Sequence, residues 1–139
     1  DFVVHLCHAS DSDLEKIRDA GISVVVCPRS NAHFGNRAPL EKMISLGLDV
    51  GFGTDNGMLC SVNMIDEIQF IRKEFGDLSL QSILSIACFG LDDMFNKDRT
   101  STYSNLEQSG WVLLSRAAED NFESVFSPNT KILGVRWRN

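Results

Sequence analysis

One buried strand decides the fold, and it reads Gly51-Phe52-Gly53-Thr54-Asp55. Its apolar part stops abruptly on the carboxylate of Asp55, and a helix-like segment at residues 39–47 precedes it with a tight glycine turn between the two. In α/β folds the loops at the carboxyl ends of parallel strands carry the chemistry, because the sheet beneath holds them in place. We therefore expect Asp55 to stand at the functional edge of a parallel sheet.

The flanking segments alternate between strand and helix signals. In chain order we expect a strand at residues 2–6, a helix that starts in the signal at 10–13 and ends at Gly21, a strand at 22–27, a loop at 29–38, a helix at 39–47, the strand at 49–55, a helix at 63–75, and a helical stretch at 77–90 with a short further turn at 91–95. Ser12 and Glu15 have the spacing of a capping box for the first helix. This order predicts a parallel sheet with right-handed crossovers.

The sequence changes character after residue 95. Residues 96–105 are polar and typical of a linker. Residues 111–115 and 131–137 are strand candidates, and their polar connection has room for a short helix near Phe122. We expect an α/β domain at residues 1–105 and a small β element at residues 106–139.

Length, charge and cysteine content exclude several classes of protein. At 139 residues the chain is well short of the roughly 250 residues of a complete (β/α)8 barrel. A net charge of −6 without clustered Lys or Arg argues against a nucleic-acid partner, and no apolar run reaches the ~20 residues of a membrane span. Four cysteines without a CxxC pair predict reduced thiols in a cytoplasmic protein. The chain opens directly on an apolar run, so we expect further residues upstream.

Two histidines follow the first strand candidate, at His5 and His8. On a strand, residues three apart point to opposite faces, so a strand continued through both histidines could not place them in one metal site. We expect the strand to end near His5 and only one imidazole, that of His5, to enter the pocket. If the strands ending at His5 and Asp55 belong to one parallel sheet, an imidazole and a carboxylate meet at its rim, and both are ligands that Zn²⁺ or Fe²⁺ accepts. A catalytic zinc usually takes three protein ligands, so we expect the remaining ligands to come from upstream residues.

Simpler roles remain open for each of these residues. A histidine at a strand end commonly bonds a backbone carbonyl, and Asp55 can simply cap the loop that follows it. Gly51-Phe52-Gly53 does not match the glycine pattern of a dinucleotide site. Cys27 has no activating base nearby in the sequence, which argues against a nucleophilic thiol.

Several segments taken together resemble one enzyme family. They are His5-Leu6-Cys7-His8, Cys27-Pro28-Arg29-Ser30-Asn31, Phe34-Gly35, Pro39 and Gly53-Thr54-Asp55. In this order and at these intervals they resemble the second half of amidohydrolase-superfamily enzymes, most of all the cytosine deaminase and chlorohydrolase-like branch. The resemblance implies the second part of a (β/α)8 TIM-like barrel, about strands six to eight with their helices, plus a short C-terminal β element.

The resemblance also implies roles for single residues. Asp55 matches the family's metal-binding aspartate, which helps to take a proton from the metal-activated water. His5 matches a histidine that contacts the metal, the attacking hydroxide or the substrate. Ser30 and Asn31 match the loop that shapes the substrate end of the pocket, where a structural role is the other interpretation. His33 replaces a more usual aliphatic residue of that loop and is a candidate contact for an anionic substrate group, with simple solvation as the alternative.

Two functions from different classes fit the sequence. The first is part of a metal-dependent hydrolase, with zinc or else iron as the metal, that cleaves a non-peptide C–N bond by deaminating a small ring substrate. The family's first-strand His-x-His pair and fifth-strand histidine are absent, so we expect these residues alone to be inactive. The second is a non-catalytic α/β piece for binding or self-association, because three parallel strands leave open edges. We expect the missing N-terminal half of the barrel, or a second copy of the chain, to cover those edges.

Overall fold

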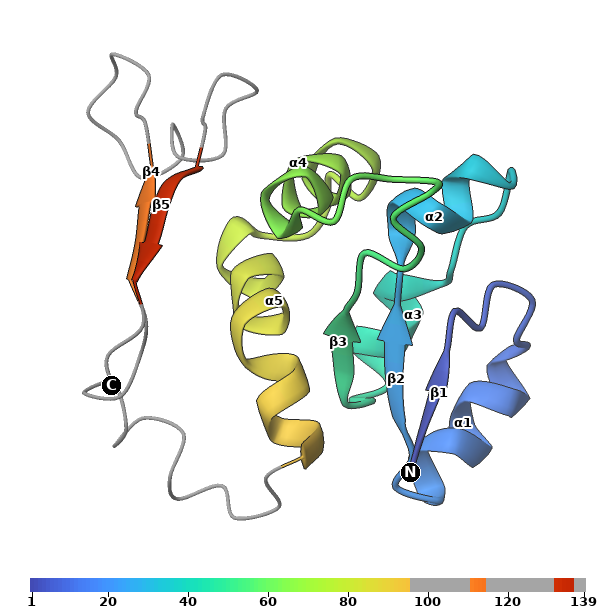
Figure 1. The fold of residues 1–139 in the computed structure, drawn as a ribbon. Coiled ribbons are helices and arrows are strands. Elements are labelled where there is room, and N and C mark those ends of the chain that lie inside the picture. Colours follow the sequence, from blue (N-terminus) through green and yellow to red (C-terminus); the bar gives the residue numbers. More distant parts are fainter. Residues whose placement is uncertain (96–110, 115–131, 137–139) are drawn as a thin grey trace. The chain divides into compact units, whose positions relative to one another are not determined.

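The computed structural model describes residues 1–95, 111–114 and 132–136 (Figure 1). The chain divides into two compact units, Asp1–Lys97 and Asp98–Asn139. The predicted domain boundary after residue 105, the predicted linker at 96–105 and the predicted helix near Phe122 lie outside the described residues.

The first unit is built on a parallel sheet of three short strands. These are β1 (Phe2–Val4), β2 (Ser23–Val26) and β3 (Val50–Phe52), paired in the order β1-β2-β3. Val3 pairs with Val24, and Val24 pairs with Val50, so β2 is the central strand. β2 and β3 are almost entirely buried, which explains why their sequences are continuous apolar segments. The predicted α/β class and parallel sheet are confirmed, and all three strands end at the same edge.

The first helix, α1 (Asp11–Asp19), begins at a complete capping box. The Ser10 hydroxyl accepts a hydrogen bond from the N–H of Asp13 at 3.2 Å, and the Asp13 carboxylate accepts one from the N–H of Ser10 at 3.0 Å. The pair predicted from the sequence, Ser12 and Glu15, is wrong because Ser12 already lies inside the helix.

A short helix, α2 (Pro28–His33), follows β2 where the sequence predicted a loop, so that prediction is wrong. Pro28 lies in the first turn, where its missing N–H has no intrahelical partner to lose and its fixed φ favours the helix. The residues after it are mostly polar and show no helical periodicity. α3 (Leu40–Ser45) lies within the predicted helix, and Gly47 follows it with a left-handed φ of 73° that suits glycine.

Two longer helices follow β3. α4 (Met64–Glu74) is capped by Asn63, whose side chain accepts a hydrogen bond from the N–H of Ile65. α5 (Leu80–Phe95) is continuous, although the sequence predicted a stop at Gly90 and a separate turn. That prediction is wrong because Gly90 is not in the left-handed conformation that ends helices. It lies inside the helix and lets α5 approach β3 closely (Figure 1).

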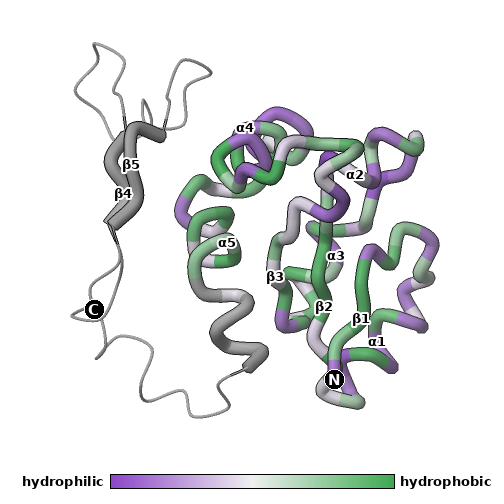
Figure 2. The backbone as a smooth tube through the Cα atoms, viewed as in Figure 1, coloured by the Kyte–Doolittle hydropathy of each residue, from purple (hydrophilic) through white to green (hydrophobic). Residues whose placement is uncertain are grey.

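Apolar side chains of the strands and helices form the core of the first unit. Figure 2 shows the apolar strands beside helices of mixed character. The largest fully buried apolar side chains are those of Leu14, Val24, Val26, Leu40, Met43, Phe52, Ile71 and Ile83. Among the described helices, none is long and apolar enough to cross a bilayer.

The described part of the second unit is an antiparallel pair of strands, β4 (Trp111–Leu114) and β5 (Ile132–Arg136). Trp111 pairs with Arg136, and the register shifts near the end of β4. Both strands lie within the segments that the sequence predicted as strands.

The close contact between α5 and β3 makes Gly90 sensitive to any side chain. A Cβ at Gly90 would lie 2.2 Å from the carbonyl oxygen of Val50 and 3.0 Å from Cα of Gly51, and neither backbone atom can rotate away. We expect Gly90→Ala to lower the free energy of unfolding by about 1–3 kcal/mol, the usual cost of overpacking. Gly76→Ala is the control, because a Cβ there meets nothing within 4 Å. Urea unfolding measures both variants, and equal midpoints would contradict the close contact.

Candidate active site

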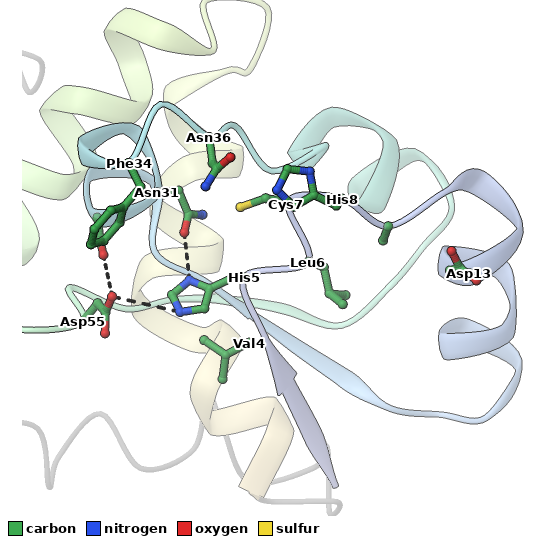
Figure 3. A pocket seen from close by; sticks show the side chains of 12 residues that line it. Val4, His5, Leu6, Cys7, His8, Asp13, Asn31, Phe34, Asn36 and Asp55 are labelled. Atoms are coloured by element: carbon green, nitrogen blue, oxygen red, sulfur yellow. Dashed lines mark hydrogen bonds and ion pairs between the residues drawn. The ribbon is translucent and has the colours of Figure 1, made fainter.

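A cavity opens at the carboxyl edge of the sheet, between the strand ends and α2 (Figure 3). Its volume is about 580 Å³, which falls in the range of about 300–1,000 Å³ typical of small-molecule sites. Four of the predicted site residues line it: His5, Ser30, Asn31 and Asp55. The other lining residues are Val4, Leu6, Cys7, His8, Ala9, Asp13, Phe34 and Asn36. His33, the fifth predicted residue, is not among them.

His5 enters the cavity through a tight turn that ends β1. Its N–H still donates to the carbonyl of Val25 at 2.8 Å, while the N–H of Leu6 donates back to the carbonyl of Val4 at 3.0 Å. This i to i+2 bond closes a three-residue turn in which His5 has a φ of 71° and Leu6 a φ of 52°. Left-handed backbone is costly for residues other than glycine, and it clusters at functional sites.

Both His5 and His8 line the cavity, so the prediction that only one imidazole enters it is wrong. The predicted end of the strand near His5 is confirmed, since β1 stops at Val4 and the chain turns immediately afterwards. Beyond this turn His8 lines the cavity as well. His8 lies apart from the His5–Asp55 pair in Figure 3. Cys7 is beside it, and burial raises the pKa of the Cys7 thiol.

A hydrogen bond to Asn31 fixes the orientation of the His5 ring. His5 Nδ1 lies 2.8 Å from the amide oxygen of Asn31, which can only accept, so Nδ1–H is the donor. In the neutral ring Nε2 then keeps its lone pair, and Nε2 is the nitrogen that faces Asp55. Histidines that ligate metals are commonly held in this way through their other nitrogen.

Asp55 faces His5 from the segment that follows β3, with a left-handed φ of 59°. The Ser30 hydroxyl donates a hydrogen bond to Asp55 Oδ2, and the same oxygen lies 4.0 Å from His5 Nε2. The side chains of His5 and Asp55 are 41% and 33% exposed. Ser30 and Asn31 are only 1% and 5% exposed. Two reactive groups therefore face the cavity, and two buried groups hold them from beneath.

The His5–Asp55 pair fits a divalent metal in chemistry and in reach. An imidazole nitrogen and a carboxylate oxygen are common zinc ligands, and at bond lengths of about 2.0–2.2 Å two tetrahedral ligands lie about 3.3–3.6 Å apart, a separation that a closure of about half an ångström would give this pair. These two atoms are 4.0 Å apart. Over residues 1–95 and the two described strands beyond them, no group of three or more His, Cys, Asp or Glu side chains is placed to hold a metal. The pair could thus provide two of the three ligands usual for a catalytic zinc.

Phe34 and Asn36 line the cavity, although neither was predicted as a site residue. The Phe34 ring is 64% exposed and meets the ring of His33 edge-on, with 5.3 Å between centroids. An aromatic side chain within a polar segment was the signal available in the sequence. His33 therefore reaches the cavity only through its contact with Phe34.

Cys27 lies at the end of β2 beneath the site and is buried. Burial raises the pKa of its thiol to about 12, helped by the negative charges of Asp55 and Glu67. Only the thiolate is a nucleophile, so at neutral pH this thiol is inert.

The family model of the Amidohydrolase family matches residues 2–100, a span that contains the whole parallel sheet and every residue that lines the cavity. This chain belongs to the amidohydrolase family.

Relatives of this amidohydrolase include aminohydrolases and deaminases. A putative aminohydrolase from Archaeoglobus fulgidus is 43% identical over 137 residues, which cover 90% of this chain and 39% of that protein. A 5-methylthioadenosine/S-adenosylhomocysteine deaminase from Natronomonas pharaonis is 32% identical over 73 residues, which cover 52% of this chain and 16% of that protein. The chain therefore spans less than half the length of these relatives.

A solved structure shares the fold of the amidohydrolase chain. It is an adenosine deaminase from Xanthomonas campestris with bound zinc, which superposes with a TM-score of 0.58 at 21% sequence identity. The match covers 64% of this chain and 22% of the deaminase chain. At this identity the similarity supports the α/β fold.

The buried thiol gives this amidohydrolase a measurable signature. The pKa of Cys27 rises from 9.0 to about 12 on folding, so the folded state holds the proton longer, and the stability this contributes is complete below pH 9 and lost as the pH rises towards 12. In the native protein at pH 8 we expect Cys27 to resist iodoacetamide, and in urea to react like an ordinary thiol. Peptide mass spectrometry measures both rates. Rapid labelling of native Cys27 would contradict its burial.

Proposed function

We propose that this chain is part of a metal-dependent aminohydrolase, forming about strands six to eight of a (β/α)8 barrel, and that the enzyme deaminates an amino-substituted ring. Membership of the amidohydrolase family supports the hydrolysis of a C–N bond. In the proposed reaction the oxygen of water forms a bond to the ring carbon, the C–N bond breaks, and the amine leaves as ammonia.

The observation that carries this proposal is the approach of His5 Nε2 to Asp55 Oδ2, 4.0 Å apart at the edge of the cavity. When the His5 ring is neutral both atoms bear lone pairs, and the hydrogen bonds of the two side chains place no proton donor between them. Two such atoms face each other favourably when a cation or a polarised water lies between them.

A divalent metal such as zinc, when bound, lowers the pKa of a water molecule to about 7 and so supplies the nucleophile. His5 and Asp55 are the residues of this chain that would hold it. The zinc named for the adenosine deaminase from Xanthomonas campestris supports this class of metal.

Asp55 is the residue that moves the proton. A carboxylate at the edge of the cavity accepts a proton from the attacking water and passes it to the leaving amine. The hydrogen bond from Ser30 fixes the rotation of this carboxylate, and the hydrogen bond to Asn31 does the same for the His5 ring. Ser30 and Asn31 thus act by placing the two reactive groups.

A planar ring substrate fits the wall of the cavity. Phe34 presents an exposed aromatic face there, and aromatic rings stack favourably in offset arrangements. The relatives support the same class, since two of them are named as deaminases of 5-methylthioadenosine or S-adenosylhomocysteine and of adenosine. In this arrangement His33 supports the Phe34 ring from the side.

We expect Asp55→Asn to lower kcat for ring-amine hydrolysis by about 10²–10⁴-fold, the usual contribution of a general base. The assay is ammonia release by the full-length protein. Asp19→Asn is the matched control, because Asp19 is an exposed partner of Arg18 at the end of α1. Wild-type turnover in the Asp55 variant would remove this residue from the mechanism.

Dialysis of the full-length protein against a chelator should abolish hydrolysis, and added zinc should restore it. His5→Ala should leave the protein with less than one metal per chain after dialysis in metal-free buffer, because one ligand is lost. His33→Ala is the control for metal content, since its ring lies outside the cavity. Elemental analysis decides: a full metal complement in the His5 variant would exclude His5 as a ligand.

A further inference from the structure

Glu67 is a fully buried carboxylate that is not among the residues lining the cavity, and its Oε1 is hydrogen-bonded to the backbone of Arg29. It lies in the first turn of α4, a helix whose other buried residues are Ile68 and Ile71. Burying a charged group is costly, and a hydrophobic residue of similar size is often equally stable or more so. Burial accordingly raises the pKa of Glu67, against the opposing influence of Arg29. Stability alone is therefore a weak reason for a carboxylate here.

The contact that Glu67 makes is with the beginning of α2. Its Oε1 accepts a hydrogen bond from the backbone N–H of Arg29 at 2.8 Å. This N–H belongs to the first turn of a helix, where no intrahelical acceptor exists, and the residue at the N-cap, Cys27, offers no side-chain hydrogen bond. A side chain of α4 thus does what an N-cap serine or aspartate usually does within its own helix.

α2 needs such help because it has only six residues. Isolated helices shorter than about 12 residues are marginal in water, so the geometry of α2 depends on its tertiary contacts. The two residues that follow Arg29 are Ser30 and Asn31, which bond Asp55 and His5. The order of this first turn therefore decides where the two reactive side chains stand.

The Arg29 side chain extends the same connection to the loop that follows Asp55. Its guanidinium donates to the Ser61 hydroxyl at 3.1 Å and to the Ser61 carbonyl at 3.3 Å, while Nη1 lies 3.8 Å from Glu67 Oε2. One buried acid and one arginine therefore join α2, α4 and the loop between β3 and α4.

We infer that Glu67 is a positioning residue of the active site, which caps α2 from α4 and thereby holds Ser30 and Asn31 against Asp55 and His5. Glu67 itself touches no substrate. The inference rests on the proposed function only where turnover is measured, because the order of α2 can be observed without any substrate.

The test compares Glu67→Leu, which removes the acceptor and keeps the volume, with Glu67→Gln, which keeps an acceptor oxygen. In the full-length protein we expect the Leu variant to lose about 10- to 100-fold in kcat, as is common for groups that orient catalytic residues, with a smaller change in KM. The Gln variant should recover most of that loss. Glu74→Leu is the matched control, because Glu74 lies on the same helix but is exposed on its far end.

Hydrogen exchange supplies the readout that is independent of activity. We expect the amides of residues 29–33 to exchange at least tenfold faster in Glu67→Leu than in wild type, with amides of α4 unchanged, and the Gln variant to stay near wild type. Unchanged exchange and turnover in the Leu variant would overturn the inference, and so would equal losses in Leu and Gln. If the Leu variant fails to fold, hydrogen exchange of the wild-type protein still tests the inference, because an Arg29 amide that is not protected from exchange would overturn the inference. Absence of any hydrolysis would count against the proposed function alone.

Discussion

Parallel pairing of β1, β2 and β3 is the constraint on which the site depends. Because all three strands run in the same direction, their carboxyl ends meet at one edge, and His5, α2 and Asp55 leave the sheet there together. Residues 50 positions apart in the sequence thereby approach to 4.0 Å. An antiparallel β3 would place Asp55 at the opposite end of the sheet, and no local change could restore the pair.

The site is arranged as two layers that differ in exposure. His5 and Asp55 stand at the cavity on left-handed backbone, which holds each side chain in a direction that an extended strand does not give. Beneath them Ser30 and Asn31 are buried and supply one hydrogen bond each. In the proposed reaction the upper layer carries the chemistry, and the lower layer gives it a fixed geometry.

The sequence was sufficient for features that depend on local pattern. The valine-rich run of β2, the apolar strand before Asp55 and the Asn63 cap were all predictable from neighbouring residues. The sequence was insufficient where a residue far away in the chain determines the local structure. α2 has no periodic apolar face and owes its first hydrogen bond to Glu67, so propensity alone suggests a loop.

Distance in sequence also explains the other wrong predictions. A glycine near the end of a helical segment usually indicates that the helix stops there. Gly90 instead lies inside α5, where the absence of a side chain allows the close contact with β3. His8 was not expected in the cavity, because its place depends on the left-handed turn at His5 and Leu6, which no residue pattern indicates. In each case the local structure depends on contacts with residues distant in the sequence, which local propensity does not include.

The split of α2 into a buried start and an exposed end has a consequence for how the ligand preference of the proposed enzyme can change. Ser30 and Asn31 are enclosed, whereas His33 and Phe34 lie at the surface of the same short segment. New side chains at the exposed end would alter which molecules fit, while the chemical apparatus a few residues earlier stays undisturbed. Such a segment is a natural place for ligand preference to diversify among relatives, and a practical starting point for laboratory libraries.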